Sequence, residues 1–340
     1  MTYFITTPIY YVNDAPHIGH AYTTIACDIL SRYNKLKGDK TFFLTGTDEH
    51  GQKVEKAALS KKKDTQNFVD EMSQNFRDLI PFLGCQIDDF IRTTEERHKI
   101  ATQFLWNKLK DNDQIYLSNY EGWYSIRDEA FYLESELTKT ENGLIAPSGA
   151  PVEWVKEESY FFKLSQWENK LLEYYEKNPD SILPRSRYNE VLSFIRGGLK
   201  DLSISRTTFK WGVQVPDTEN HVMYVWIDAL CNYITALNYP NTDHDSFKTF
   251  WPGIHVVGKD ILRFHAVYWP AFLMAAGLEP PKQIFAHGWW TNEGQKISKS
   301  VGNIINPYEI IDTYGLDQIR FFLFREVPFG NDGDFSKDAI

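Results

Sequence analysis

The apolar positions near the start of the chain follow two different periods. Residues 3–7 and 41–45 are short runs rich in aromatic and β-branched side chains, which predicts two β-strands. Between them, apolar residues recur every three or four positions and predict a helix that buries one stripe: Ile18, Tyr22, Ile25, Ile29, Tyr33 and Leu36. Pro16 suits the first turn of that helix, and Gly38 suits its C-terminal end. A strand, a helix and a strand in this order predict a right-handed βαβ unit with parallel strands.

A second unit of this kind is predicted late in the chain. Residues 254–257 and 284–286 resemble strands, and residues 261–276 resemble a helix that ends at Gly277. The middle of the chain is different, because turn signals alternate there with a short strand-like run at 159–163 and a helical pattern at 167–177. We therefore expect an α/β fold in which an inserted α+β domain splits a parallel sheet. The expected boundaries are 1–113 and 221–281 for the two halves of the sheet, 114–220 for the insertion, and 282–340 for a short, mainly helical region.

Composition narrows the function classes. The formal net charge is −10 and the pI is about 5.4, which argues against a protein that coats nucleic acid, although a local basic patch stays possible. The only cysteines, Cys27, Cys85 and Cys231, form no Cys-x-x-Cys pair, so a disulfide framework is not expected and a reducing compartment fits. No apolar run reaches the length of a membrane span, and no targeting segment is evident at the start. We expect a cytoplasmic protein that does not bind membranes.

Two histidines lie where the first strand gives way to the first helix. His17 and His20 are separated by Ile18 and Gly19, so both imidazoles fall on one face of the helix start. Ligands bind outside the carboxyl ends of strands in open α/β sheets, and a helix N-terminus attracts phosphate. Gly19 leaves room for a flat base against the backbone. A chance pairing or a metal pair is the alternative, but a third metal ligand is not evident nearby.

A lysine-rich segment at residues 294–300 follows the late strand. Lys296 and Lys299 stand three apart among Gly and Ser, which favours a loop with two ammonium groups on one side. Lysine contacts phosphate as a flexible point charge. The alternative to a phosphate-binding loop is a solvated, lysine-rich turn.

These two motifs are similar to the signatures of class I aminoacyl-tRNA synthetases. The string His17-Ile-Gly-His20 matches the HIGH signature at every letter, and residues 296–300 resemble KMSKS with Ile297 in place of Met. Because position 297 is apolar in both versions, its packing role is expected to persist. The resemblance implies a Rossmann-like catalytic core.

Further segments resemble methionyl-tRNA synthetases across essentially the whole chain. They are residues 3–13, 42–51, 91–98, 201–206, 224–229 and 258–262. The resemblance implies activation of L-methionine with ATP and Mg²⁺ to methionyl adenylate, followed by transfer to tRNA(Met) in protein synthesis. It places His17 and His20 near the α-phosphate and Lys296 and Lys299 near the departing pyrophosphate. A carboxylate nucleophile requires no general base, so catalysis is expected from positioning and charge stabilisation.

The resemblance also implies two sets of binding residues. Asp48 could pair with the substrate ammonium, and either His265 or Tyr11 could donate a hydrogen bond towards sulfur. The alternatives are that Asp48 caps the following helix and that His265 and the aromatic residues are ordinary core. The implied methionine-binding residues are Ile9, Tyr11, Asp48, Trp226, Ala229, Tyr233, Ile261 and His265. The implied ATP-binding residues are Gly19, Gly258, Asp260, His287 and Gly288.

The sequence departs from the family pattern in two places. Many methionyl enzymes hold zinc in the insertion, but the ligand positions here fall on Ser125, Asp128, and near Ala146 and Gly149. Since Ser, Ala and Gly supply neither thiolate nor imidazole, we expect no zinc. The chain ends at Ile340, so we expect the helical anticodon-binding bundle of the family to be nearly absent and anticodon recognition to be lost. Separately, we expect a monomer in this form.

Three other readings stay open at this level. The first is a synthetase of the same class for another apolar or thiol amino acid; the three-Cys composition and the absence of a large editing insertion disfavour the leucine, isoleucine and valine enzymes. A small-molecule nucleotidyltransferase shares the histidine turn but not the large insertion or the lysine segment. A catalytically inactive tRNA-binding or scaffold protein is disfavoured by the intact His17, His20, Lys296 and Lys299.

Overall fold

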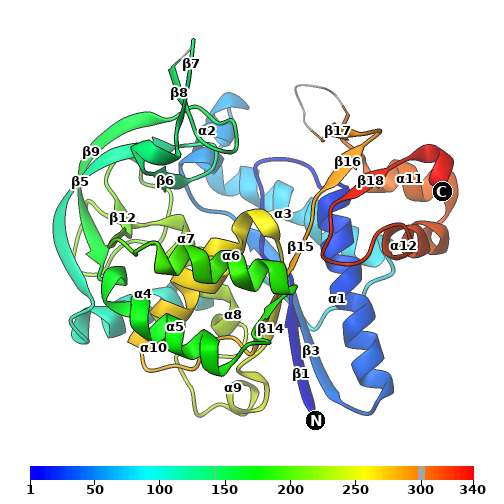
Figure 1. Cartoon of the computed structure of the whole chain (residues 1–340), viewed down its shortest axis with the longest axis horizontal. Coiled ribbons are helices and arrows are strands. Elements are labelled where there is room, and N and C mark those ends of the chain that lie inside the picture. The colour runs from blue at the N-terminus through cyan, green and yellow to red at the C-terminus, as the bar shows by residue number, and fades with distance from the viewer. Residues whose placement is uncertain (142, 298–302) are drawn as a thin grey trace.

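A parallel sheet forms the centre of the molecule (Figure 1). The structure is a computed structural model that describes residues 1–141, 143–297 and 303–340, without the side chains of Lys296 and Lys337. The strands of the sheet lie in the order β10 (Ile182–Leu183), β15 (Gln283–His287), β14 (Ile254–Gly258), β1 (Thr2–Thr6), β3 (Lys40–Asp48) and β2 (Tyr10–Tyr11). Strand β4 (Asp89–Arg92) also pairs with β3, and every pair of strands in the sheet is parallel. The α/β fold class predicted from the sequence is confirmed.

Helix α1 (Ile18–Leu36) connects β1 to β3 and packs against β1, β3 and β14. It begins after His17, whose side chain accepts a hydrogen bond from the Gly19 N–H, while the His20 side chain accepts one from the His17 N–H. This reciprocal cap starts the helix later than expected, so Pro16 lies before the cap rather than in the first turn. Gly38 follows the C-cap with φ +88°, as expected for a residue that ends a helix in the left-handed region.

Other helices flank the sheet and the segments around it. On the side of α1 lie α11 and α12, whereas α5, α6 and α10 lie on the other side (Figure 1). The bounds of the helices outside the insertion are α2 (Gln52–Ser60), α3 (Thr65–Phe82), α4 (Glu96–Asp111), α7 (Val225–Leu230), α8 (Asn232–Thr235), α9 (Asp245–Phe250), η3 (Lys259–Ile261), η4 (Phe264–Tyr268), α10 (Trp269–Ala275), α11 (Pro307–Tyr314), α12 (Leu316–Arg325) and η5 (Lys337–Ala339).

The segment between α4 and β14 carries a long antiparallel hairpin. Strands β5 (Ile115–Ser125) and β9 (Glu153–Phe162) pair along nearly their whole length, flanked by β6 (Ala130–Tyr132) and β11 (Leu202–Ser203). The hairpin stands away from the central sheet, with β7 and β8 at its tip (Figure 1). The other elements here are η1 (Glu134–Glu136), β7 (Thr138–Thr140), β8 (Gly143–Ile145), η2 (Leu164–Trp167), α5 (Glu168–Lys177), α6 (Arg185–Arg196), β12 (Ser205–Arg206) and β13 (Val222–Met223).

The central sheet crosses two of the expected domain boundaries. Strand β10 belongs to the segment 114–220 but pairs with β15, and β15 itself lies beyond residue 281. After β15, the short strands β16 (Trp290–Asn292), β17 (Gln295–Lys296) and β18 (Gly333–Phe335) form a small sheet beside α11 and α12. Local patterns could not show this, because a strand of two residues is defined by its distant partner.

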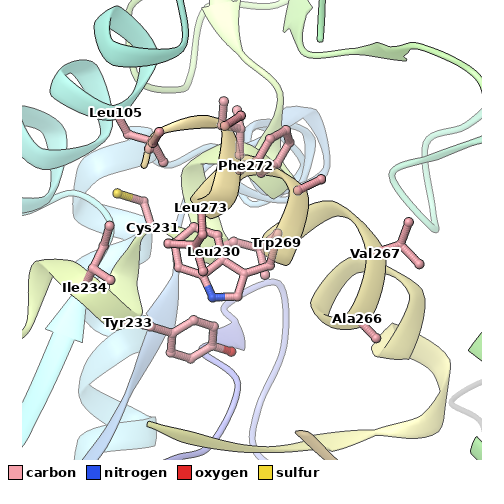
Figure 2. Close-up of a cluster of buried hydrophobic side chains, with 14 of the residues drawn as sticks. Leu105, Leu230, Cys231, Tyr233, Ile234, Ala266, Val267, Trp269, Phe272 and Leu273 are labelled. Carbon is pink, nitrogen blue, oxygen red and sulfur yellow. The ribbon is translucent and has the colours of Figure 1, made fainter. Parts of the chain in front are cut away.

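The largest core lies between the sheet and the helices that follow the insertion. Figure 2 shows Trp269 of α10 facing Leu230 and Tyr233, which come from the segment of α7 and α8. Trp269 is fully buried and Tyr233 is 1% exposed. Removing a buried aromatic side chain of this kind typically costs about 3–5 kcal/mol. This core therefore holds in place the helices that supply one wall of the site described next.

Two further observations bear on the whole chain. The three cysteines are buried free thiols. Within the described ranges, the helices are all too short or too polar to cross a membrane.

Candidate active site

A cavity of about 840 Å³ lies at the carboxyl ends of the central strands. Its wall includes residues at or just beyond the carboxyl ends of β1, β3, β14 and β15, the edge at which open parallel sheets bind ligands. Every predicted site residue whose side chain is described lines it: Ile9, Tyr11, His17, Gly19, His20, Asp48, Trp226, Ala229, Tyr233, Gly258, Asp260, Ile261, His265, His287 and Gly288. Lys299 lies outside the described residues, and so does the side chain of Lys296. Ile297 lines the same cavity and packs against an apolar core, as expected.

The two histidines of the first turn present their Nε2 atoms as hydrogen-bond donors. His17 Nδ1 accepts the Gly19 N–H at 3.1 Å, and His20 Nδ1 accepts the His17 N–H at 3.0 Å. Burial lowers the pKa of His17 to about 4, and burial together with the neighbouring His17 lowers the pKa of His20. Both rings are therefore neutral at pH 7, with their proton on Nε2. Their centroids are 3.9 Å apart, so one phosphoryl group could receive both donors.

The carboxyl ends of the paired strands β14 and β15 also contribute residues to the cavity. The pKa of His287 is lowered by burial, and its Nδ1 donates to the Gly288 carbonyl at 2.8 Å. The Thr23 hydroxyl lies 2.8 Å from its Nε2, which ties β15 to α1. Asp260 accepts a hydrogen bond from the Trp289 indole at 3.0 Å. A side chain at Gly288 would collide with the Asn331 backbone, 2.2 Å from its Cβ position, so the chain passes closely there.

The same cavity contains an acidic side chain with an unused acceptor. Asp48 ends β3, is 6% exposed, and its Oδ1 has no hydrogen-bond partner. Burial, followed by the charges of Asp228 and Glu129, raises the pKa of Asp48 well above its usual range. The next helix, α2, is preceded by Gly51 and has no side-chain cap, so Asp48 is not the helix cap considered above. A buried carboxylate with a free oxygen matches a cationic ligand.

Aromatic rings form the wall next to Asp48. Trp226 stacks on Phe264 with centroids 3.7 Å apart, and Tyr233 stacks on His255 at 3.9 Å. Such flat, rigid surfaces suit an unbranched apolar chain, and contacts between sulfur and aromatic rings are favourable.

In the structure, both candidate donors towards sulfur use their protons in hydrogen bonds within the protein. His265 Nδ1 donates to the Ile261 carbonyl at 2.9 Å, so its Nε2 accepts from the Tyr233 hydroxyl at 2.7 Å. Burial lowers the pKa of His265 to about 4, which excludes a second proton at pH 7. The Tyr11 hydroxyl donates to the His50 carbonyl at 2.9 Å. The His265 proton is thus engaged with a carbonyl one turn earlier and the Tyr11 proton with a carbonyl from another segment, so the hydrogen bond towards sulfur stays a prediction.

The comparison with known proteins identifies the family of the chain. The family described as tRNA synthetases class I (M) matches residues 3–340. The chain belongs to this family.

Individual relatives cover the chain completely. Methionine--tRNA ligase of Rickettsia conorii is 64% identical over 340 residues, and the chain spans 66% of that protein's length. The structure of Mycobacterium tuberculosis methionyl-tRNA synthetase in complex with methionyl-adenylate matches with a TM-score of 0.98 and 51% identity, covering 100% of this chain and 67% of that one. The apo form of the M. tuberculosis enzyme matches with a TM-score of 0.82 and 48% identity, covering 99% of this chain and 64% of that one.

Within this synthetase fold, the residues at the positions of the family's zinc ligands form hydrogen bonds with each other or with their neighbours. The Asp128 N–H donates to Ser125 Oγ at 3.3 Å, and the Asp128 carboxylate accepts from Tyr132 at 2.9 Å and from Ser148. The Gly149 N–H donates to the Ala146 carbonyl at 2.8 Å. The hydrogen bond from Ser148 to Asp128 links the two turns, which a bound metal ion links in a zinc knuckle.

Sequence reasoning missed two acidic groups whose charges act on Asp48. Asp228 is fully buried and lies 2.7 Å from both His50 Nδ1 and His98 Nε2. Glu129, in the turn between β5 and β6, lines the cavity from the insertion. No periodicity marks either residue. An available signal for Glu129 was its place directly after Asp128, at the end of the turn that replaces the first zinc-ligand pair.

Proposed function

We propose that this chain activates L-methionine with ATP, forming methionyl adenylate and pyrophosphate, as the catalytic part of a methionine–tRNA ligase. The observation that carries the proposal is one cavity lined by two chemically different sets of groups. We assign them to two ends of the cavity: the unpaired oxygen of buried Asp48 with the stacked aromatic rings to one, and the Nε2–H donors of His17 and His20 to the other. The chain's closer match to the adenylate-bound relative than to its apo form supports the same reading.

In the proposed first step, a carboxylate oxygen of methionine attacks the α-phosphorus of ATP. The new oxygen–phosphorus bond forms as the bond from the α-phosphorus to the bridging oxygen of pyrophosphate breaks. Asp48 would hold the ammonium so that the carboxylate faces the phosphorus, and His17 and His20 would donate to the α-phosphate oxygens as charge moves onto them. Lys296 and Lys299 would contact the departing pyrophosphate, an assignment that rests on their motif.

Magnesium fits this site as an ion held by the substrate. In the described part of the chain, no group of three or more His, Cys, Asp or Glu side chains could hold a metal ion. Mg²⁺ commonly keeps several waters and binds substrate phosphates rather than a protein cage, and it would neutralise charge on the triphosphate.

The wider proposal concerns the whole protein. It comprises transfer of the methionyl group to tRNA(Met), a cytoplasmic location, a monomeric state and the absence of zinc. The relatives' printed function supports the transfer, and the residues Ser125, Asp128, Ala146 and Gly149 at the knuckle positions support the absence of zinc.

Amino-acid-dependent ATP–pyrophosphate exchange tests the proposal. We expect exchange with methionine and at least about 100-fold lower kcat/KM with leucine, isoleucine or cysteine. The reason is that one methylene in an apolar pocket contributes about 1–3 kcal/mol and each sulfur–aromatic contact about 0.3–1.5 kcal/mol, and a different side chain loses several of these together. Exchange that is equally fast with another amino acid would assign the site to that substrate, and no exchange with any amino acid would refute the proposal.

A further inference from the structure

Glu129 enters the catalytic cavity from the inserted hairpin. It is 5% exposed and adopts φ +47°, a conformation that is uncommon for a residue with a side chain. Its carbonyl accepts a hydrogen bond from the buried Tyr224 hydroxyl at 2.6 Å, which anchors the backbone next to α7. Strained backbone that is held by its surroundings is concentrated at functional sites. The hairpin is therefore attached to the core at this residue, and its carboxylate is fixed in position.

The carboxylate of Glu129 lies against the end of β2 and the start of α2. A Cβ at Gly51 would lie 2.5 Å from Glu129 Oε1 and 2.5 Å from the Tyr11 hydroxyl, so the three groups meet with no room for a side chain at residue 51. The Lys53 N–H points to the same Oε1 at 3.4 Å. Tyr11 and Asp48 are register partners of the same strand pair, β2 and β3. Glu129 and Asp48 therefore approach the same end of the cavity from two domains.

The negative charge at this end is only partly matched by the protein's own cations. Among the described residues, Glu129 forms no ion pair with Lys, Arg or His. The charge of Lys53, followed by that of Arg206, acts on Glu129, while the Lys53 ammonium donates to the Arg127 carbonyl at 3.3 Å and lies over the Tyr11 ring. Burial raises the pKa of Glu129 to about 7, while the charge of Glu129 contributes to the raised pKa of Asp48. Two buried acids beside a cavity are stabilised in their charged form by a cation that enters it.

We propose that Glu129 is a second anionic group of the amino-acid site, which acts with Asp48 on the α-ammonium of the substrate. The inference rests on the proposed function and extends it, because it makes the inserted domain part of amino-acid recognition. The competing explanation is structural: Glu129 lies at the N-terminus of α2 and could merely complement that helix end.

Ligands that differ in the ammonium group separate the two explanations. L-Methionine and L-methioninol carry the ammonium, whereas 4-(methylthio)butanoate keeps the thioether and carboxylate but lacks it. In the Glu129→Gln variant we expect about tenfold weaker binding of the first two ligands and less than about a twofold change for the third, as for loss of one charged hydrogen-bonding partner. The measurements are the KM of methionine and the inhibition constants of the two analogues in exchange, with the KM of ATP unchanged.

The matched control is Glu121→Gln, the same change at an exposed position on β5, which should leave all three constants unchanged. Equal weakening of all three ligands by Glu129→Gln, or no weakening, would overturn the inference. Both outcomes leave methionine-dependent exchange by the unmodified chain intact, so they are distinct from failure of the proposed function. If Glu129→Gln does not fold, Glu129→Asp replaces it: its shorter carboxylate should weaken only the two ammonium-bearing ligands, and uniform weakening would again refute the inference.

Discussion

The Asp48→Asn variant is expected to raise the KM for methionine by about 100-fold or more. Asparagine keeps the shape of the side chain but removes its charge, so the buried ammonium of the substrate loses its partner. Removing one partner of a buried ion pair typically costs about 3–5 kcal/mol, and every 1.4 kcal/mol corresponds to a factor of ten in affinity. The effect should be confined to the amino acid, because Asp48 lies at the far end of the cavity from His17 and His20 in the proposed complex.

Steady-state exchange kinetics measure this effect, with methionine and ATP varied separately. The KM for ATP should change by less than about threefold, and the Glu121→Gln control should match the unmodified chain. An equal rise in both KM values would indicate a general disturbance of the site. An unchanged KM for methionine would remove Asp48 from ammonium recognition.

The Asp228→Asn variant is expected to lose about 3–5 kcal/mol of stability at pH 7. Asp228 is fully buried, and its two oxygens lie 2.7 Å from His50 and 2.7 Å from His98. Because the three residues come from α7, the loop between β3 and α2, and α4, the change breaks a junction of three segments. Urea unfolding measures the loss, and a difference below about 1 kcal/mol would show that the junction contributes little.

The same carboxylate gives the expected dependence on pH. Burial alone would raise the pKa of Asp228, but the charge and hydrogen bond of His50, together with those of His98, outweigh burial and lower it from 3.8 to about 2. A group with a lowered pKa stabilises the fold above its unfolded value and loses that contribution as pH falls through its folded value. The part of the free energy of unfolding that Asp228 contributes should therefore be lost between about pH 4 and pH 2, and this loss should be absent in Asp228→Asn.

The sequence predicted the long, locally determined elements well. The strands around residues 3–7, 41–45, 254–257 and 284–286 and helix α1 all exist, because each carries its own period and its own end signals. Strands β2 and β10, with two residues each, could not be predicted, because only pairing with β3 and β15 defines them.

For the site, the sequence predicted positions better than proton arrangements. Residues placed at the carboxyl ends of strands reach one cavity as a consequence of parallel topology. The engagement of the Tyr11 and His265 protons depends on acceptors chosen by the fold, such as the His50 carbonyl, 39 positions from Tyr11. Glu129 belongs to another domain and arrives through a turn in the left-handed region, which no local pattern reveals.

The most direct test of the account is a calorimetric titration with a non-hydrolysable sulfamoyl analogue of methionyl adenylate. The analogue spans both ends of the cavity at once. The account predicts one molecule bound per chain, at least about 100-fold more tightly than methionine or ATP alone, because the two ends act on one ligand. An analogue that does not bind, or binds no more tightly than adenosine, would contradict the assignment of the two ends to one reaction.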